Sequence, residues 1–210
     1  MSRTFALIPA AGKSRRMGKP KLAMALGERT VLEWVLEAMK QAGIGEIVVV
    51  VGPQGEELAA LAEKAKAHVL RLENDTPDMQ ATVLLGLDWL ETHLHPDPVD
   101  SWLLAPADHP TLNSAVVMEL LKAKKEHPAQ SIFIPSHAGR RGHPALIAWQ
   151  HVPGLRLWPP GQGLNRFLRR LAAQTRECPM DDPEVLCDLD TLEDFQRVLQ
   201  QLRDWEKVQK

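Results

Sequence analysis

The sequence predicts an α/β fold built on a mostly parallel β-sheet, and two observations lead to this class. Residues 47–51 (IVVVV) are β-branched at every position and stop at Gly52-Pro53, which is typical of a strand buried on both faces of a parallel sheet. Stretches of this kind alternate along the chain with stretches whose apolar residues recur at helical spacing. This alternating order is characteristic of layered α/β proteins.

Short apolar runs predict the strands. Each is too short for a helix that must bury a face, and several are rich in β-branched residues. The expected strands are residues 5–10, 47–51, 69–72, 102–105, 131–134 and 145–148. The Pro- or Gly-rich segments 93–100 and 152–163 are the best candidates for linkers.

The first helix has a recognisable beginning and end. Thr30 and Glu33 have the spacing of a capping box, in which each side chain bonds the backbone of the other residue. The apolar face that follows comprises Val31, Trp34, Val35, Ala38 and Met39. We expect this helix to end at Gly43.

Further helices are expected between the remaining strands. They lie around residues 58–62, over residues 79–90, from an Asn113 cap to residue 121, and after a Thr191 cap. The last of these carries one apolar face formed by Leu192, Phe195, Val198, Leu199, Leu202 and Trp205.

Composition excludes several classes of protein. The 25 basic and 27 acidic residues give a formal net charge of −2, whereas a general nucleic-acid binder carries a basic excess. Hydrophobic residues make up 44% of the chain, which is too many for a disordered protein. No stretch approaches the roughly 18 consecutive apolar residues of a membrane span. We expect one domain over residues 1–210, located in the cytoplasm, that binds neither nucleic acid nor a membrane.

The segment after the first expected strand has the composition of a phosphate-binding loop. Small residues that permit close backbone approach are Ala10, Ala11, Gly12 and Gly18. Five basic residues follow one another closely: Lys13, Arg15, Arg16, Lys19 and Lys21. Positive charge and free N–H groups at the carboxyl end of a strand suit a polyphosphate. The pattern matches neither a P-loop nor a dinucleotide fingerprint, and the alternative is a solvated basic turn.

The same segment carries a family resemblance. Residues 7–21 (LIPAAGKSRRMGKPK) are similar, without a gap, to the L-x-x-A-G-x-S-x-R-M-G-x-x-K signature of the MobA-like nucleotidyltransferases, and in particular to the molybdenum-cofactor cytidylyltransferase branch. The resemblance implies a three-layer, Rossmann-like (GT-A-like) fold. It also implies that the loop wraps a triphosphate, with Gly12, Ser14, Arg16 and Lys21 at the matching contact positions.

An aspartate follows another expected strand. Asp108 lies just beyond residues 102–105 and could cap the next helix, although Asn113 is better placed for that role. In the family, the D-x-P element supplies a magnesium ligand, which the resemblance places at Asp108. Mg²⁺ usually takes few carboxylates and completes its shell with phosphate oxygens and water.

A second group of acids precedes the last expected helix. Residues 188–194 (DLDTLED) contain four acids, and acids near a helix N-terminus interact favourably with its dipole. This interaction with the helix dipole is a sufficient explanation for Glu193 and Asp194. The stretch also resembles the [DN]-x-[DN]-T-x-E-D motif of the family, which supplies a second metal contact. The resemblance assigns this contact to Asp190 first and to Asp188 second.

Two further segments concern the substrates. Residues 140–147 (RRGHPALI) resemble a G-H-P-x-L tract that lies near the acceptor in the cytidylyl branch, so His143 is a candidate binding residue or a structural histidine. Residues 74–82 depart from the family, since they lack its aromatic residue, glycine and serines. Asn74 and Thr82 could still bond a base or ribose there, and a simple polar loop explains them equally well.

The resemblance implies transfer of a nucleoside monophosphate from CTP, with GTP as the alternative, to a phosphorylated acceptor of the molybdopterin type. Lys21, Arg16 and Asp108 would be the catalytic residues, with Mg²⁺ as cofactor. Arg15 and Gly18 would contribute to the nucleotide loop, and a molybdoenzyme is a candidate partner. The rival hypotheses are transfer to another small phosphate, such as a sugar phosphate, and a catalytically silent nucleotide-binding accessory protein for molybdoenzymes.

Overall fold

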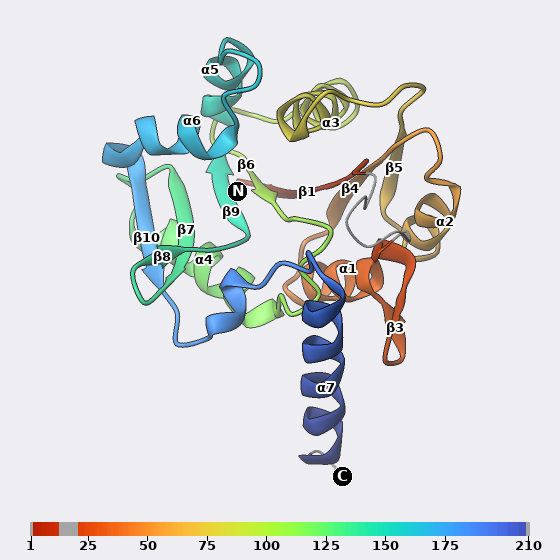
Figure 1. The fold of residues 1–210 in the computed structure, drawn as a ribbon. Helices are drawn as coiled ribbons and strands as arrows, with labels where there is room; N and C mark the ends of the chain where they lie inside the picture. The colour runs from red at the N-terminus through yellow and green to blue at the C-terminus, as the bar shows by residue number, and fades with distance from the viewer. Residues whose placement is uncertain (1, 13–20, 209–210) are drawn as a thin grey trace.

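A central β-sheet organises the molecule (Figure 1). The computed structural model describes residues 2–12 and 21–208, with side chains up to residue 201. The sheet strands are β1 (Thr4–Ala10), β4 (Glu46–Val51), β5 (His68–Arg71), β6 (Ser101–Leu104), β7 (Ile132–His137), β8 (Arg140–Arg141), β9 (Ala145–Ala148) and β10 (Thr175–Pro179). Their order is β10-β7-β9-β6-β1-β4-β5, with β8 paired to β7.

Most of the sheet is parallel, as the sequence predicts. Strand β1 pairs in parallel with both β4 and β6, and β4 does so with β5. Strand β9 is antiparallel to its two neighbours, β6 and β7. A small hairpin of β2 (Ala25–Leu26) and β3 (Arg29–Thr30) lies outside this sheet.

Helices cover both faces of the sheet and produce three layers (Figure 1). One face packs on α1 (Val31–Gln41), α2 (Glu56–Lys64), α4 (Ser114–Glu126) and α7 (Leu192–Val208). The other packs on α3 (Met79–Leu94), α5 (Val152–Arg156) and α6 (Leu164–Arg170). The short 3₁₀ turns are η1 (Lys21–Ala23), η2 (Trp149–His151), η3 (Ala172–Gln174) and η4 (Pro183–Leu186).

The central strands divide the core into two halves. In β1, Phe5 and Leu7 belong to the core under α3, whereas Ala6 and Ile8 belong to the core over α1. All four side chains are fully buried. Alternate residues of a strand point to opposite faces, so a continuous apolar run is required where both faces are covered.

The predicted helix caps are confirmed. The Thr30 side chain accepts from the Glu33 amide, and the Glu33 carboxylate accepts from the Thr30 amide. Asn113 Oδ1 accepts from the Val116 amide at 3.0 Å. Thr191 Oγ1 accepts from the Asp194 amide at 3.1 Å, which makes Thr191 the cap of α7.

The structure contains strands and helices that the sequence patterns did not predict. Strand β10 (TRECP) is an edge strand with mostly exposed side chains, so it lacks the apolar run of an interior strand. Segment 152–163 is not simply a linker, since it begins with the short helix α5. Within the described residues, no helix combines the length and the apolarity needed to cross a membrane.

Gly86 allows α3 to approach the sheet closely. A methyl group at this position would collide with Leu7 and lie 3.0 Å from Val50 Cγ2. We expect Gly86→Ala to lower the free energy of unfolding by about 1–3 kcal/mol through overpacking, despite the better helix propensity of alanine.

The matched control is Gly154→Ala in α5, where an added methyl group would make only ordinary contacts with Phe167 at 3.7 Å. This variant should be neutral or slightly stabilising. Urea denaturation measures both variants. Equal stability of the two would contradict close packing at Gly86.

Candidate active site

The candidate site lies where the order of the parallel strands reverses. After β1 the chain proceeds to β4 on one side, and β6 pairs with β1 on the other side. Ligands of open α/β sheets bind outside the carboxyl ends of strands at such a reversal. Lys21 comes from the segment after β1, and Asp108 follows β6.

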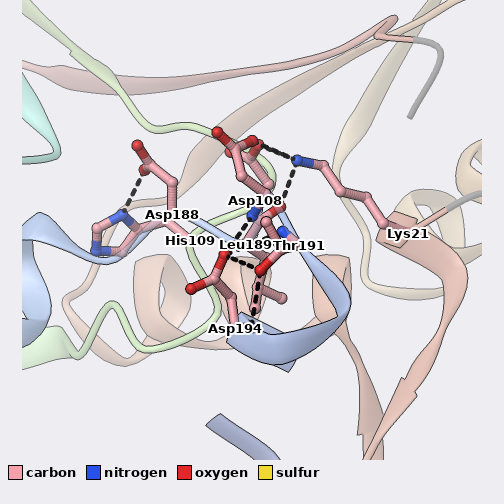
Figure 2. A network of polar contacts seen from close by, with 8 residues as sticks. Lys21, Asp108, His109, Asp188, Leu189, Thr191 and Asp194 are labelled. Carbon is pink, nitrogen blue, oxygen red and sulfur yellow. Dashed lines mark hydrogen bonds and ion pairs between the residues drawn. The ribbon is translucent and has the colours of Figure 1, made fainter. Parts of the chain in front are cut away.

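The Lys21 ammonium group contacts two carboxylates, and Figure 2 shows it pointing toward Asp108. Its Nζ donates to Asp108 Oδ2 at 2.6 Å and is 3.4 Å from Asp190 Oδ1. It also donates to the backbone carbonyl of Leu189 at 2.5 Å. Only 14% of the Lys21 side chain is exposed, so the charge is partly withdrawn from water and depends on these oxygens.

The acidic segment before α7 is fixed against the loop after β6. The Leu189 amide donates to the Asp108 carbonyl at 2.9 Å, and the Leu189 side chain is 1% exposed in the core. Asp194 accepts from the Thr191 hydroxyl at 2.7 Å. That hydrogen bond is the main reason why the pKa of Asp194 is lowered. Asp194 therefore acts as part of the helix cap, as the sequence reading of these acids expects.

Asp188 faces a buried imidazole. His109 is fully buried, with Nδ1 3.4 Å from Asp188 Oδ1 and Nε2 2.7 Å from the Glu184 carbonyl. The hydrogen bond from His109 lowers the pKa of Asp188, with His143 and Lys21 also contributing. Asp188 is consequently ionised at neutral pH and fixed on the side of the acidic segment away from Lys21 (Figure 2).

His143 owes its position to the glycine before it. A side chain at Gly142 would collide with the Val185 carbonyl, and the His143 amide donates to that same carbonyl at 2.9 Å. The imidazole packs edge-on against His109, with 6.2 Å between ring centroids. Burial lowers the pKa of His143, which keeps the ring neutral near neutral pH.

A pocket of about 440 Å³ connects these groups. Its walls come from the end of β1, the start of α3, the loop after β6, the β8–β9 turn, the start of α6 and the acidic segment. The lining residues are Pro9, Asp78, Met79, Gln80, Leu104, Pro106, Asp108, His143, Gly161, Gly163, Leu164, Asn165, Asp188 and Asp190. A pocket of this size suits a small-molecule ligand.

The structure brings together one group of the predicted site residues. Asp108, Asp188, Asp190 and His143 line the pocket, and Lys21 contacts two of them. The small residues of the first loop lie at the same edge: Ala10 is the last, buried residue of β1, followed by half-buried Ala11 and exposed Gly12. Ser14, Arg15, Arg16 and Gly18 lie outside the described residues.

Two predicted binding residues lie elsewhere. Asn74 is exposed in the loop between β5 and α3 and does not line the pocket. Thr82 is 4% exposed, and its hydroxyl contacts the Thr76 hydroxyl at 2.5 Å and the Asp78 carbonyl at 3.2 Å. The Thr82 hydroxyl thus has two partners within the protein.

Gln80 lies in no recognised sequence motif. This residue is 3% exposed and lines the pocket. The signal was present, because Gln80 precedes Val83, Leu87 and Leu90 at the spacing of the buried face of α3. A polar side chain at such a position requires either an internal partner or a ligand.

The residues present fit a divalent cation that a substrate helps to hold. Asp108 and Asp190 contact one cationic nitrogen, and carboxylates are the ligands that Mg²⁺ and Mn²⁺ prefer. Among the described residues, no three acidic, histidine or cysteine side chains are placed to enclose a metal ion by themselves. A cation here would therefore take further ligands from phosphate and water.

Comparison with known proteins agrees with this geometry. The sequence pattern of the MobA-like NTP transferase domain matches residues 6–175. The chain belongs to this family. The match covers most of β1, the loop after it, Asp108 and His143, whereas the acidic segment 188–190 lies beyond it.

Several known proteins and solved structures are similar to this chain over nearly its whole length. Nicotine blue oxidoreductase of Paenarthrobacter nicotinovorans is 27% identical, over 90% of this chain and 93% of its own length. Molybdenum cofactor cytidylyltransferase of Escherichia coli K12 is 22% identical, over 93% of this chain and 95% of its own length. The crystal structure of Rv0371c from Mycobacterium tuberculosis H37Rv superposes with a TM-score of 0.77 at 23% identity, covering 95% of this chain and 98% of that one. A second structure of Rv0371c is a complex with manganese.

The lowered pKa of His143 predicts a pH-dependent stability. Between the ordinary histidine pKa of about 6.5 and the lower value in the folded protein, the unfolded chain binds more protons. Stability is therefore full above about pH 6.5 and falls as the pH is lowered. We expect the wild type to lose more unfolding free energy than His143→Gln between pH 7 and pH 5, by about 1.4 kcal/mol for each unit of pKa difference.

Urea titrations at several pH values measure this slope. His93→Gln is the control, because it removes an exposed histidine at the end of α3 and should keep the wild-type slope. Parallel pH profiles for the wild type and His143→Gln would contradict the burial of a neutral imidazole at this position.

Proposed function

We propose that the chain transfers a nucleoside monophosphate from a nucleoside triphosphate to a phosphorylated acceptor of the molybdopterin type, with release of pyrophosphate. CTP is the favoured donor and GTP the alternative. Membership of the NTP transferase family supports the reaction class. The name of the Escherichia coli relative and the signature in residues 7–21 support the acceptor and CTP.

One observation carries the proposal. The Lys21 ammonium lies between Asp108 and Asp190 at the pocket, directly after the Gly-rich segment that follows β1. Opposite charges meet here at the carboxyl ends of two parallel strands. Phosphoryl and nucleotidyl transfer depend mainly on positioning and charge neutralisation, and this arrangement supplies both kinds of charge.

We assign the residues the following roles. Asp108, with Asp190 as first choice and Asp188 as second, would hold Mg²⁺, which neutralises charge on the phosphate oxygens when bound. Lys21 and Arg16 would hold the triphosphate and stabilise the charge that develops during transfer. The neutral His143 would contact the acceptor. The acceptor phosphate is already anionic near neutral pH, so its attack on the α-phosphate requires no general base.

A pyrophosphate-release assay tests the reaction. It combines each of the four ribonucleoside triphosphates with molybdopterin or with a sugar phosphate, in the presence of Mg²⁺ or Mn²⁺. Release with CTP and molybdopterin supports the proposal. Activity with the sugar phosphate alone would overturn the acceptor, and nucleotide binding without release under any condition would indicate a silent accessory protein.

Removing one charge at the centre of the site should abolish most of the activity. In Asp108→Asn the side chain keeps its shape and loses its charge, so Lys21 loses its closest ionic partner and a cation would lose a ligand. We expect kcat to fall on the order of 10²-fold or more and Mn²⁺ binding, followed by electron paramagnetic resonance, to weaken.

Asp88→Asn is the control for this variant. Asp88 pairs with Arg156 on the exposed side of α3 and does not line the pocket. Its substitution should change neither rate nor Mn²⁺ binding. An Asp108→Asn variant that retains the wild-type rate would rule out the assigned role of Asp108.

A further inference from the structure

His109 joins the loop after β6 to η4 and to the acidic segment before α7. Its imidazole is fully buried, and both ring nitrogens face an oxygen. Nε2 is 2.7 Å from the Glu184 carbonyl, and Nδ1 is 3.4 Å from Asp188 Oδ1. A carbonyl oxygen can only accept a hydrogen bond, so Nε2 is the donor on that side. The two contacts fix the rotation of the ring, and the ring in turn fixes Asp188.

The carboxylates of the site fall into two groups. Asp108 and Asp190 contact the Lys21 ammonium, whereas Asp188 faces His109, away from Lys21 (Figure 2). The Asp188 side chain lines the pocket and is 49% exposed. Among the described residues, only its Oδ1 has a hydrogen-bond partner. A cation held by Asp108 and Asp190 therefore leaves Asp188 open to another ligand.

An ionised carboxylate at this position selects the chemical group that can approach it. The hydrogen bond from His109 lowers the pKa of Asp188, so the carboxylate is charged near neutral pH. Phosphate oxygens are repelled by it at short range. A carboxylate can only accept hydrogen bonds, so the matching group is a donor. Two neighbouring N–H groups suit it best, because they can bond both of its oxygens at once.

Asp188 belongs to the half of the pocket on the β9 side. Its partner His109 packs edge-on against His143, which lies in the turn that leads into β9. Leu104 also lines the pocket, and it pairs with Ala145 at the start of β9. In the sheet, β9 lies on one side of β6, whereas β1, β4 and β5 lie on the other. The proposed function places the acceptor at His143, and Asp188 shares that wall.

The remaining lining of this half favours a flat ring. Leu104, Pro106 and Leu164 are apolar, and His143 Nδ1 is buried without a partner among the described residues. Apolar walls with a few oriented polar atoms suit a planar ring that has a polar edge. A polyol presents hydroxyl groups on all sides, and many of them would lose their hydrogen bonds to water against these walls.

We propose that Asp188 is a specificity-determining residue for the acceptor, that its carboxylate accepts hydrogen bonds from N–H groups on the edge of a flat nitrogen heterocycle, and that His109 is the positioning residue that holds it. This inference rests on the proposed function. It names the part of the acceptor that is bound, and it assigns Asp188 to the acceptor, while Asp108 and Asp190 hold the cation.

The Asp188→Asn variant tests the role of the carboxylate. Its side chain keeps its size but loses its charge and one accepting oxygen. We expect KM for molybdopterin to rise about ten-fold or more, since hydrogen bonds to a charged group are lost. We expect kcat, the KM for CTP and the Kd of Mn²⁺, followed by electron paramagnetic resonance, to change little. Asp190→Asn is the matched variant, in which the Kd of Mn²⁺ should rise instead.

Asp181→Asn is the control for loss of charge, because Asp181 is exposed and lies outside the pocket lining. It should keep all of these constants. An unchanged KM for molybdopterin in Asp188→Asn would overturn the proposal. A Kd of Mn²⁺ that rises as much as in Asp190→Asn would make Asp188 a ligand of the cation, and a raised KM for CTP would place it against the nucleotide. Both results would overturn the proposal equally.

Two substitutions at His109 separate its two contacts. The Asn amide takes the place of Nδ1, so His109→Asn keeps a donor toward Asp188. The Gln amide reaches the place of Nε2, so His109→Gln keeps only the donor toward the Glu184 carbonyl. Both lose packing, which urea denaturation measures. We expect KM for molybdopterin to rise in His109→Gln and to return toward the wild-type value in His109→Asn. Equal KM values at equal stability would overturn the positioning role.

Direct binding distinguishes this inference from the proposed function. A free pterin without a phosphate, followed by its own fluorescence, reports on the heterocycle site without any transfer. Binding to the wild type that weakens in Asp188→Asn supports the role of Asp188, even if the pyrophosphate assay fails. Absence of pterin binding to the wild type, with transfer to another phosphate intact, would overturn the role of Asp188 and leave nucleotidyl transfer in place.

Discussion

The contact of Lys21 with Asp108, Leu189 and Asp190 joins three distant parts of the chain. The lysine follows β1, Asp108 follows β6, and the acidic segment precedes the last helix. Without the ammonium group, two carboxylates would approach each other at the same edge of the sheet, and like charges at short range repel. The acidic segment can approach the loop after β6 because the Lys21 charge offsets part of the negative charge at this edge and the Leu189 amide donates to the Asp108 carbonyl.

Much of the fold could be predicted because some short sequence patterns are compatible with only one kind of local structure. The β-branched run at 47–51 becomes a central strand, and the Thr30–Glu33 pair becomes a capping box. Strand β10 could not be predicted from its own residues. Its backbone pairs with β7 while most of its side chains remain in solvent. The strand therefore forms because β7 offers hydrogen-bonding partners, and its own residues show no apolar pattern.

The candidate site divides in the same way. Asp108 and Asp190 could be predicted as site residues because one follows a strand, the other precedes a helix, and a family motif resembles each segment; the structure places both at one pocket. Gln80 carries no motif, and its orientation in the pocket wall depends on a hydrogen bond to a carbonyl 78 residues further along the chain. Thr82 stays a predicted binding residue, and the fold adds what its residue type did not indicate: its hydroxyl contacts Thr76 and Asp78. The Gln80 hydrogen bond joins distant segments, and the Thr82 hydrogen bonds depend on the exact path of the loop before α3. Single-sequence patterns contain neither kind of information.

The near-zero net charge acquires a structural meaning at this site. Four aspartates line one pocket. Three of them, Asp108, Asp188 and Asp190, lie beside one another in the site, and a bare acidic cluster of this kind would disfavour the compact state. Asp108 and Asp190 are balanced by Lys21, and Asp188 is held by His109, which is itself fixed by the Glu184 carbonyl. The carboxylates are thus oriented by protein groups before any ligand arrives. Preorganised charges lose little free energy to rearrangement when a phosphate substrate binds, and this favours a site built for charge stabilisation over one that must assemble around its ligand.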